Sequence, residues 1–392
     1  MIDLFQTEIE DERLDPTFKE VRDLPYYASA KGMINEVYNS WNGFDDDFVT
    51  QFQTTSFDAR LWELYLYKVF ESLGFEILDN DQTRPDFKLR KNGKVFFVEA
   101  VTSNPTNDGT AKKVLFNTFD VEKDEQFMLR IGSALFSKLN RKKKYWDLPW
   151  VKGHPIILAI EPFHSSEGLN VNDFTVIEYL YGVIINKYFN EDGNLVVENF
   201  VKEIHTIGGK EILPFFESEG SENISGVIFS NSATMGKFTR MGFQKGYGRK
   251  EIFSFFYSGE CHNHDDRQLD SAPFYYEIKS KGKGFQDEWR FGFSYYHNHK
   301  ALLPLGYDAF DQTTQCRFLE DGITRRFACF HPYNGKNIRQ AVAKTKVSET
   351  ENTNSAFSLD EFIRSLLKGE NVKDGLKGLQ NKARLIYRKL KK

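Results

Sequence analysis

The sequence has few cysteines, no long apolar run and no strong net charge, and each absence excludes a class of protein. Three widely spaced cysteines in 392 residues do not form the framework of a disulfide-stabilised secreted domain. No stretch of about 18 apolar residues is present, so no transmembrane helix is predicted. The start, MIDLFQTEIEDERLD, lacks the basic and apolar regions of a signal peptide. We therefore expect a soluble, cytoplasmic protein with no membrane partner.

The bulk composition is that of a globular protein with two or three domains. Charged residues make up 28% of the chain and hydrophobic residues 40%, which argues against disorder. The 37 phenylalanines predict thick aromatic cores. The net charge of −4 gives no overall attraction for phosphate, so a nucleic-acid partner would need a local basic patch.

The best-defined pattern lies between residues 56 and 163. It predicts a helix (56–74), three strands (75–78, 86–90 and 95–101), a second helix (122–143) and a buried strand (154–163). Ser56 suits an N-cap and Gly74 a C-terminal stop. Asn92-Gly93 is the strongest kind of two-residue hairpin signal. The second helix is long enough to let the last strand pair in parallel with the third.

The remaining segments are less regular. Residues 173–189 (DFTVIEYLYGVIINKYF) predict a helix, 224–231 (ISGVIFSN) a buried strand, and 251–332 aromatic strands and turns. The predicted division is 1–50 as a lead-in of short helices and loops, 51–170 as one domain, 171–346 as an α+β region, and 347–392 as a polar linker with basic C-terminal helices.

Two carboxylates stand at unusual places in the three-strand segment. Asp86 follows Pro85 at the start of a strand, and Glu99 lies within the apolar run 95–101. Adjacent strands are about 4.8 Å apart, so two such carboxylates can share one cation. Oxygen ligands of this kind suit Mg²⁺ or Mn²⁺, and a bound metal ion can activate water against a phosphodiester. The alternative is that Asp86 ends a turn and Glu99 lies at an exposed strand edge.

Pro85-Asp86, followed thirteen positions later by Glu99-Ala100-Val101, resembles the PD-(D/E)xK superfamily of restriction-endonuclease-like nucleases. The similarity covers roughly residues 56–163 and includes the order helix, three strands, helix, strand. It implies an α/β fold with a restriction-endonuclease-like core and a larger C-terminal α+β region. It also implies that Asp86 and Glu99 are metal ligands. Glu63, in the preceding helix, would match an acidic residue that some members add to the metal site.

The sequence departs from the family at the lysine expected two positions after the glutamate, where Val101 stands. A hydroxyl from Thr102 or Ser103 cannot supply the missing charge. In the second helix, Lys138 falls on the apolar face, where a lysine is costly unless it is paired. Some members carry the lysine on this helix, and Lys138 would be such a migration. The alternative is a lysine that extends along the apolar face to reach water.

Cations and aromatic residues follow this helix. Arg141, Lys142, Lys143 and Lys144 precede Tyr145-Trp146, a combination able to contact phosphates and stack a base. Arg130 is a further candidate for a phosphate contact. A solvated helix end and a plain surface charge are the respective alternatives. The segment Cys261 to Asp266 contains metal-binding residue types, but its spacing favours a polar turn over a zinc site.

These observations predict an enzyme, a Mg²⁺-dependent endonuclease that hydrolyses phosphodiester bonds. The resemblance favours DNA over RNA as the partner, and defence against phage or foreign DNA as the role. Asp86, Glu99, Lys138 and Glu63 would form the site. The C-terminal region would provide substrate choice, assembly into a homodimer, or sensing. Two alternatives stay open: a catalytically degenerate nucleic-acid-binding module, and an RNase effector that uses the same site.

Overall fold

The computed structural model describes residues 2–41, 43–79, 84–103, 121–163, 171, 173–207, 209–248, 253–265, 271–279, 285–320 and 322–341. Residues 1–342 belong to one compact unit. The predicted linker and C-terminal helices, 347–392, lie outside the described residues. Within the described part of the chain, none of the helices has the length and apolar character needed to cross a membrane.

The fold is mixed α/β. Its helices are α1 (Pro16–Asp23), α2 (Ala28–Asn39), α3 (Phe48–Gln53), α4 (Phe57–Ser72), α5 (Val121–Leu139), α6 (Asp173–Tyr181) and α7 (Met235–Lys245). Its strands are β1 (Glu76–Leu78), β2 (Phe87–Lys91), β3 (Lys94–Thr102), β4 (Ile156–Glu161), β5 (Val183–Phe189), β6 (Leu195–Val201), β7 (His205–Ile207), β8 (Lys210–Ile212), β9 (Gly226–Ser230), β10 (Phe253–His262), β11 (Ser271–Ile278), β12 (Phe293–His297), β13 (Thr314–Leu319), β14 (Gly322–Arg326) and β15 (Pro332–Ala341).

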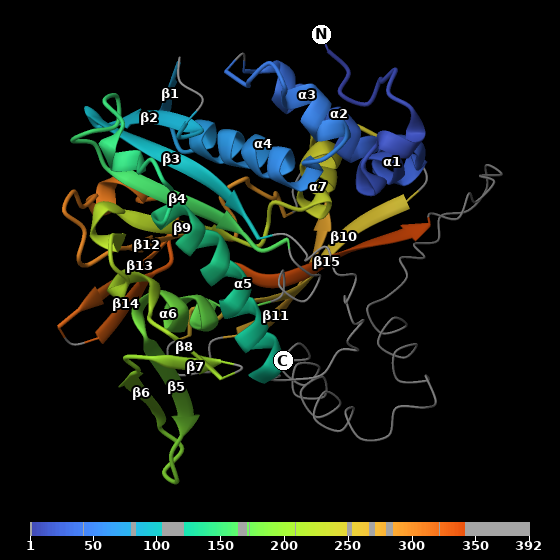
Figure 1. Ribbon diagram of the computed structural model, residues 1–392. Coiled ribbons are helices and arrows are strands. Elements are labelled where there is room, and N and C mark those ends of the chain that lie inside the picture. The colour runs from blue at the N-terminus through green and yellow to red at the C-terminus, as the bar shows by residue number, and fades with distance from the viewer. Residues whose placement is uncertain are drawn as a thin grey trace, which may run out of the picture. The chain divides into compact units, whose positions relative to one another are not determined.

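One eight-stranded sheet organises the unit (Figure 1). Its order is β1-β2-β3-β4-β9-β12-β13-β14. Strands β3, β4 and β9 are mutually parallel, whereas β1, β2 and β3 run antiparallel to one another in turn. The strands come from both sides of residue 170, so the predicted nuclease-like segment and the region after it share this sheet.

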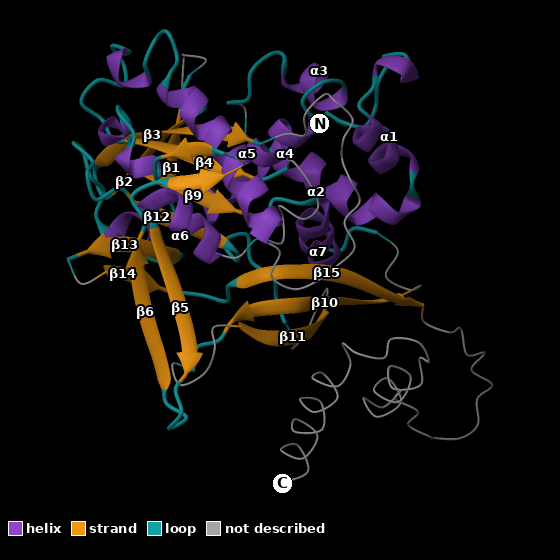
Figure 2. Ribbon diagram, turned by 60° about the horizontal axis from the view of Figure 1, so that its bottom comes forward, coloured by secondary structure: helices purple, strands orange, loops and turns teal. Residues whose placement is uncertain are grey.

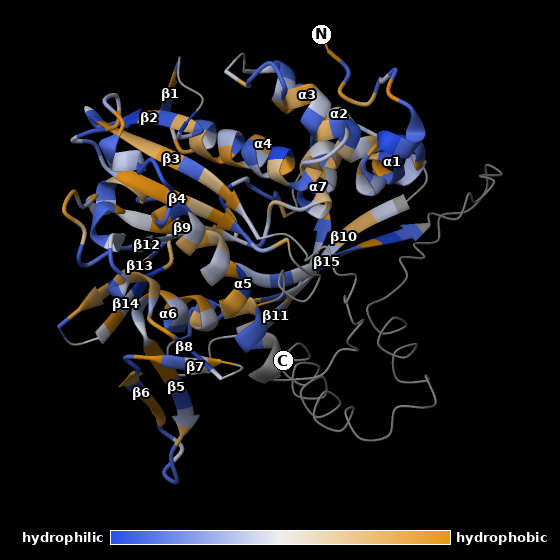
Figure 3. Ribbon diagram, viewed as in Figure 1, coloured by the Kyte–Doolittle hydropathy of each residue, from blue (hydrophilic) through white to orange (hydrophobic). Residues whose placement is uncertain are grey.

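Two apolar cores cover the two faces of the sheet. On one face, α4 packs Trp62 and Tyr65 with Val98 of β3 and Ala159 of β4. On the other face, side chains of α5 and α6 pack with Phe97 of β3 and other strand residues. Figure 3 shows the apolar character of β3 and β4, which lie between these layers. Alternate residues of one strand therefore enter different cores, as strand geometry requires.

Local sequence accounts for the helix and hairpin that begin the sheet. Helix α4 ends just before Gly74, whose φ of +74° is the left-handed conformation that glycine adopts without steric cost. Asn92 and Gly93 have φ values of 50° and 75°, the conformation of a tight hairpin turn between β2 and β3. The predicted helix, strands and parallel β3–β4 pairing are confirmed, with small shifts in their ends.

Two helix predictions were too long. The helix predicted over 173–189 ends at Tyr181, and the chain continues as strand β5. Gly182 has a φ of +72°, and the β-branched residues after it favour a strand. The helix predicted over 122–143 ends at Leu139, four residues early, so Lys142 is not on its face.

A smaller three-stranded sheet, in the order β11-β10-β15, lies beside helix α7 (Figure 2). Buried charges join them: Asp287 accepts hydrogen bonds from Lys237 Nζ and Arg240 Nε of α7, each over 2.6 Å. The Arg240 guanidinium also lies 3.7 Å from the centre of the Tyr257 ring in β10. This charged group connects the main sheet layer to the smaller sheet.

Candidate functional site

The β2–β3 hairpin places Asp86 and Glu99 on the same face of the sheet. Phe87 pairs with Val98 in this antiparallel ladder. One residue further along each strand, Asp86 therefore lies beside Glu99. Phe87 and Val98 both enter the core on the α4 side. Because side chains alternate along a strand, Asp86 and Glu99 both point to the α5 side.

Glu99 is buried and not at an exposed strand edge, so that alternative interpretation is wrong. Strand β3 lies between β2 and β4, and Glu99 is 2% exposed. Asp86 is fixed by the next backbone group of β3, since the Ala100 N–H donates to Asp86 Oδ2 over 2.7 Å. A carboxylate pair of which Glu99 is buried and Asp86 partly buried is costly without a compensating positive charge.

Lys138 of α5 supplies a positive charge to Glu99. Its Nζ donates to Glu99 Oε1 over 2.8 Å, and the lysine side chain is 24% exposed. Lys138 therefore lies close to the glutamate, as expected for a migrated lysine. Its catalytic role stays a prediction. Val101, which replaces the usual lysine, is buried in the core that α5 covers.

Glu63 of α4 is held by its own helix. Arg60 Nη1 donates to Glu63 Oε2 over 2.7 Å, and Arg60 Nη2 contacts Asp45 and Gln51. Burial raises the pKa of Glu63 to about 7. Arg60 lowers this pKa, whereas the negative charges of Asp45 and Glu99 raise it. Glu63 is thus electrostatically linked to the carboxylate pair and already carries a cationic partner.

Asp86 experiences the strongest opposition to ionisation. Burial raises its pKa well above the ordinary value, and the negative charges of Glu99 and Glu63 raise it further. The Ala100 N–H and the Lys138 ammonium act in the opposite direction. Carboxylates that repel one another in this way are the groups that a divalent cation stabilises on binding.

Arg141 and Tyr145, which follow the end of α5, complete the surroundings of Glu99. Burial raises the pKa of the Tyr145 hydroxyl, and the Glu99 charge raises it further, whereas Arg141 lowers it. The Arg141 guanidinium lies 4.4 Å from the centre of the Tyr145 ring. Glu99 Oε2, Tyr145 Oη and Arg141 Nη1 are buried, and none has a hydrogen-bond partner of ordinary geometry among the described residues.

The sequence identified Arg141 as a phosphate contact but gave Tyr145 only a stacking role. Tyr145 lies in a short turn after the helix, where no periodic pattern indicates direction. The signal that was available is its place in the chain, seven residues after Lys138 and next to a run of cations. These polar atoms around Glu99, which lack hydrogen bonds of ordinary geometry within the described residues, mark a position where water, a metal ion or a phosphate oxygen would complete the hydrogen bonding.

The described residues contain no group of three or more His, Cys, Asp or Glu side chains arranged to hold a metal ion. The expected set of Asp86, Glu99 and Glu63 therefore does not form a ready three-ligand cage. Mg²⁺ is commonly held by one or two protein carboxylates, with waters and substrate phosphates completing its octahedron. Asp86 and the carboxylate of Glu99 fit that smaller requirement.

Some of the remaining predicted nucleic-acid contacts are exposed, and others already contact residues of the protein. Lys142 and Lys143 are exposed, and the Lys143 ammonium lies 5.7 Å from the Trp150 ring centre. Lys144 donates to the Leu139 carbonyl and lies 5.6 Å from the Trp146 ring centre. Arg130 is half-buried on α5. These cations flank the end of α5 that carries Lys138.

A second buried glutamate lies on the adjacent strand but on the opposite face. Glu161 ends β4, is fully buried, and points to the α4 side together with Ile157 and Ala159. Burial raises its pKa well above the ordinary value, and Asp58 acts in the same direction. The Ala233 N–H opposes this shift, but neither Glu161 oxygen makes a hydrogen bond of ordinary geometry within the described residues.

A buried Asp-His-Thr series was not foreseen. His331 Nε2 lies 2.9 Å from Asp173 Oδ2, and His331 Nδ1 lies 3.1 Å from Thr314 Oγ1. The same residue types occur in nucleophilic triads. Thr314 and His331 are each 2% exposed, so a substrate cannot reach the hydroxyl. We interpret the series as a polar connection between α6, β13 and the start of β15.

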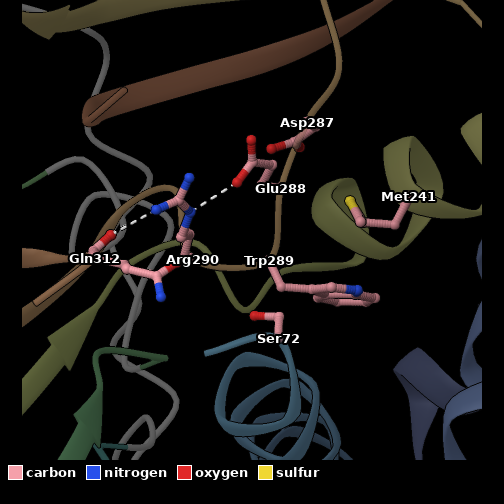
Figure 4. Close-up of a pocket in the computed structure, with 7 residues that line it drawn as sticks. All are labelled: Ser72, Met241, Asp287, Glu288, Trp289, Arg290 and Gln312. Atoms are coloured by element: carbon pink, nitrogen blue, oxygen red, sulfur yellow. Dashed lines mark hydrogen bonds and ion pairs between the residues drawn. The ribbon is translucent and has the colours of Figure 1, made fainter. Parts of the chain in front are cut away.

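One cavity, of about 240 Å³, is lined by Ser72, Met241, Asp287, Glu288, Trp289, Arg290 and Gln312 (Figure 4). Its charged groups are paired. Arg290 Nε donates to Glu288 Oε2 over 2.7 Å and its Nη1 to the Gln312 carbonyl over 2.9 Å. None of the lining residues belongs to the carboxylate pair, which is the better candidate for chemistry.

Comparison with known protein families, with curated proteins and with solved structures finds no match for this chain.

Proposed function

We propose that the protein is a metal-dependent nuclease with a restriction-endonuclease-like core. The observation that carries the proposal is the convergence of Asp86, Glu99 and Lys138 from β2, β3 and α5, with Lys138 Nζ 2.8 Å from Glu99 Oε1. The resemblance of the Pro85-Asp86 and Glu99-Ala100 segments to PD-(D/E)xK nucleases supports the same function. We propose DNA as the substrate in preference to RNA, and defence against foreign DNA in the cytoplasm as the role.

In this proposal Asp86 and Glu99 hold Mg²⁺ or Mn²⁺, and Glu63 assists through its charge. When bound, the ion supplies positive charge that stabilises the transition state of phosphodiester hydrolysis. Lys138 orients the attacking water and pairs with Glu99. Arg141 binds a phosphate oxygen of the substrate, and the Tyr145 hydroxyl donates a hydrogen bond to Glu99 Oε2 or to the water beside it.

The test is cleavage of plasmid DNA and, separately, of RNA by the full-length protein with Mg²⁺, Mn²⁺ or EDTA. We expect cleavage with either ion, none with EDTA, and none for Asp86→Ala or Glu99→Ala, both with unchanged circular dichroism. Glu161→Gln is the matched control, since it alters a buried glutamate of the adjacent strand outside the site. Cleavage that survives loss of both carboxylates would rule out the site.

One observation favours a catalytically degenerate nucleic-acid-binding module as a second candidate. Lys138 and Arg60 already neutralise Glu99 and Glu63, and the usual lysine is replaced by Val101. Such a module would bind nucleic acid through the cations after α5 and cleave nothing. Retention of labelled DNA in a binding assay, without cleavage under any metal condition, would select this alternative.

A further inference from the structure

Trp150, in the turn between α5 and β4, contacts the chain just before Asp86. Its Nε1 donates to the Arg84 carbonyl over 2.9 Å, and Arg84 is two residues before Asp86. Two residues of extended chain span at most about 7 Å. The indole also packs in part against the core on the α5 side, the face to which Asp86 and Glu99 point. An aromatic ring therefore lies close to the carboxylate pair, on the same side of the sheet.

The Trp150 ring is half-buried, and its exposed part includes the face under Lys143. The Lys143 ammonium lies over the ring, 5.7 Å from its centre. Lys143 is exposed and makes no hydrogen bond or ion pair among the described residues. A solvated ammonium reaches a ring only from the side that the core leaves uncovered. A flat ligand can replace the lysine over this face, and the lysine charge is then available to a phosphate.

The two other aromatic residues of this segment are less suited to bind a ligand. Tyr145 is fully buried, so the stacking role that the sequence suggested for it is excluded. Trp146 is half-buried, but the ammonium over its ring belongs to Lys144, which also donates to the Leu139 carbonyl. Trp150 thus combines an accessible face with a direct contact to the segment that carries Asp86.

The charge around Trp150 suits a phosphate backbone. Residues 141–152 contain five cations and a single acidic residue, Asp147. Arg84, whose carbonyl binds the indole, adds an exposed cation. In a chain with a net charge of −4, this local positive charge is what attracts a polyanion. Cations alone would bind any nucleic acid, so the ring is the element that selects among nucleic acids.

An aromatic side chain can stack only on a base whose face is free. In a duplex the neighbouring base pairs cover both faces, whereas single strands, loops and ends expose them. We propose that the site takes nucleic acid with an unpaired nucleotide beside the scissile phosphate, and that this base stacks on Trp150, an inference that rests on the proposed nuclease function. A duplex meets the requirement only where it opens, which negative supercoiling favours.

The first test compares two labelled single strands that have the same number of phosphates. One is a thymidine strand, and the other consists of abasic residues, so it keeps the backbone and lacks every base. Binding to the full-length protein is measured by fluorescence anisotropy at one salt concentration, with EDTA present to prevent metal-dependent cleavage. We expect the abasic strand to bind about 10-fold more weakly, because it loses the stacking contact. Equal affinities would overturn the proposal.

The second test changes the ring. Trp150→Leu keeps an apolar side chain against the core, and should weaken binding of the thymidine strand by about 10-fold. Binding of the abasic strand and of a duplex should stay unchanged, and Trp150→Phe should retain most of the wild-type affinity. Tyr188→Leu is the matched control, because Tyr188 is 44% exposed and belongs to β5. An equal loss on the thymidine and abasic strands would assign Trp150 a purely structural role and overturn the proposal.

These measurements separate the proposal from the nuclease function. The comparison of the two strands needs no variant, so it decides the question even if Trp150→Leu does not fold. A protein that binds the thymidine strand through Trp150 but cuts nothing with Mg²⁺ or Mn²⁺ would support stacking and contradict the nuclease function. Cleavage by a protein that binds both strands equally would do the reverse.

Discussion

Glu99 and Glu161 are buried glutamates on neighbouring strands with opposite surroundings. Glu99 points to the α5 side, where Lys138 binds one oxygen and the Tyr145 hydroxyl lies close to the carboxylate. Glu161 points to the α4 side, where no cation among the described residues pairs with it, and burial raises its pKa well above the ordinary value.

The difference shows that burial alone does not identify a reactive carboxylate. Lys138 Nζ lies within hydrogen-bond distance of Glu99 and offsets the charge of that carboxylate, as a metal ligand or electrostatic catalyst in a buried position requires. Glu161 lacks that partner and behaves as a polar core residue. The nearby charges, more than depth in the fold, separate the candidate site from the rest of the sheet.

The largest effect is expected for loss of the cation. Lys138→Met keeps the apolar stem and removes the charge, so cleavage should fall by about 10²–10⁴-fold while the protein stays folded. Lys142→Met should have little effect, because Lys142 is exposed and lies beyond the end of α5. Single-turnover cleavage rates measure both. A Lys138→Met rate close to that of the wild type would remove Lys138 from the mechanism.

An intermediate effect is expected when each glutamate becomes methionine. Glu161→Met should stabilise the fold by about 1–3 kcal/mol, because it removes a fully buried carboxyl that has no cationic partner among the described residues. Glu99→Met should destabilise it by about 1 kcal/mol, because Lys138 loses its partner but still reaches water. Urea unfolding of the two variants measures the signs. If both substitutions changed the free energy of unfolding in the same direction, the distinction between the two faces would be wrong.

The smallest effect concerns Asp58, near Glu161 on the α4 side. Burial raises its pKa to about 6, and Asp15 acts in the same direction. Because the folded-state value exceeds the unfolded one, the protonated group favours the fold fully below about pH 3.8, and this contribution is lost as pH rises through about 6. Between pH 5 and pH 7, wild type should lose about 1 kcal/mol relative to Asp58→Asn. Parallel pH profiles of unfolding would contradict this.

The sequence could predict the hairpin and its carboxylates because the signals are local. Asn92-Gly93 sets the turn, and the alternation along β3 determines which residues share a face. Lys138 was found because a lysine on an apolar helical face needs a partner. Both kinds of argument depend on regular periodicity.

The remaining features depend on contacts between distant segments. Nothing in HPIILAIEPF indicates that Glu161 is enclosed by α4 and the chain near Ala233, because a glutamate before proline equally suits an exposed strand end. Tyr145 approaches Glu99 only because the chain turns after Leu139. For the β5–β6 ribbon, Gly182 was an available signal, but apolar periodicity on both sides of it favoured a continuous helix.

The Asp287 ion group has a consequence for how the protein opens. Asp287 is 3% exposed and binds both Lys237 and Arg240. Arg240 also lies over the Tyr257 ring of β10 and donates to Asn337 Oδ1 of β15. Separating the smaller sheet from α7 would leave buried charges without partners, at a cost of several kcal/mol. Local opening of β10 is thereby suppressed. Its amide protons should exchange with solvent through unfolding of the whole unit, which makes the two sheets one cooperative folding unit.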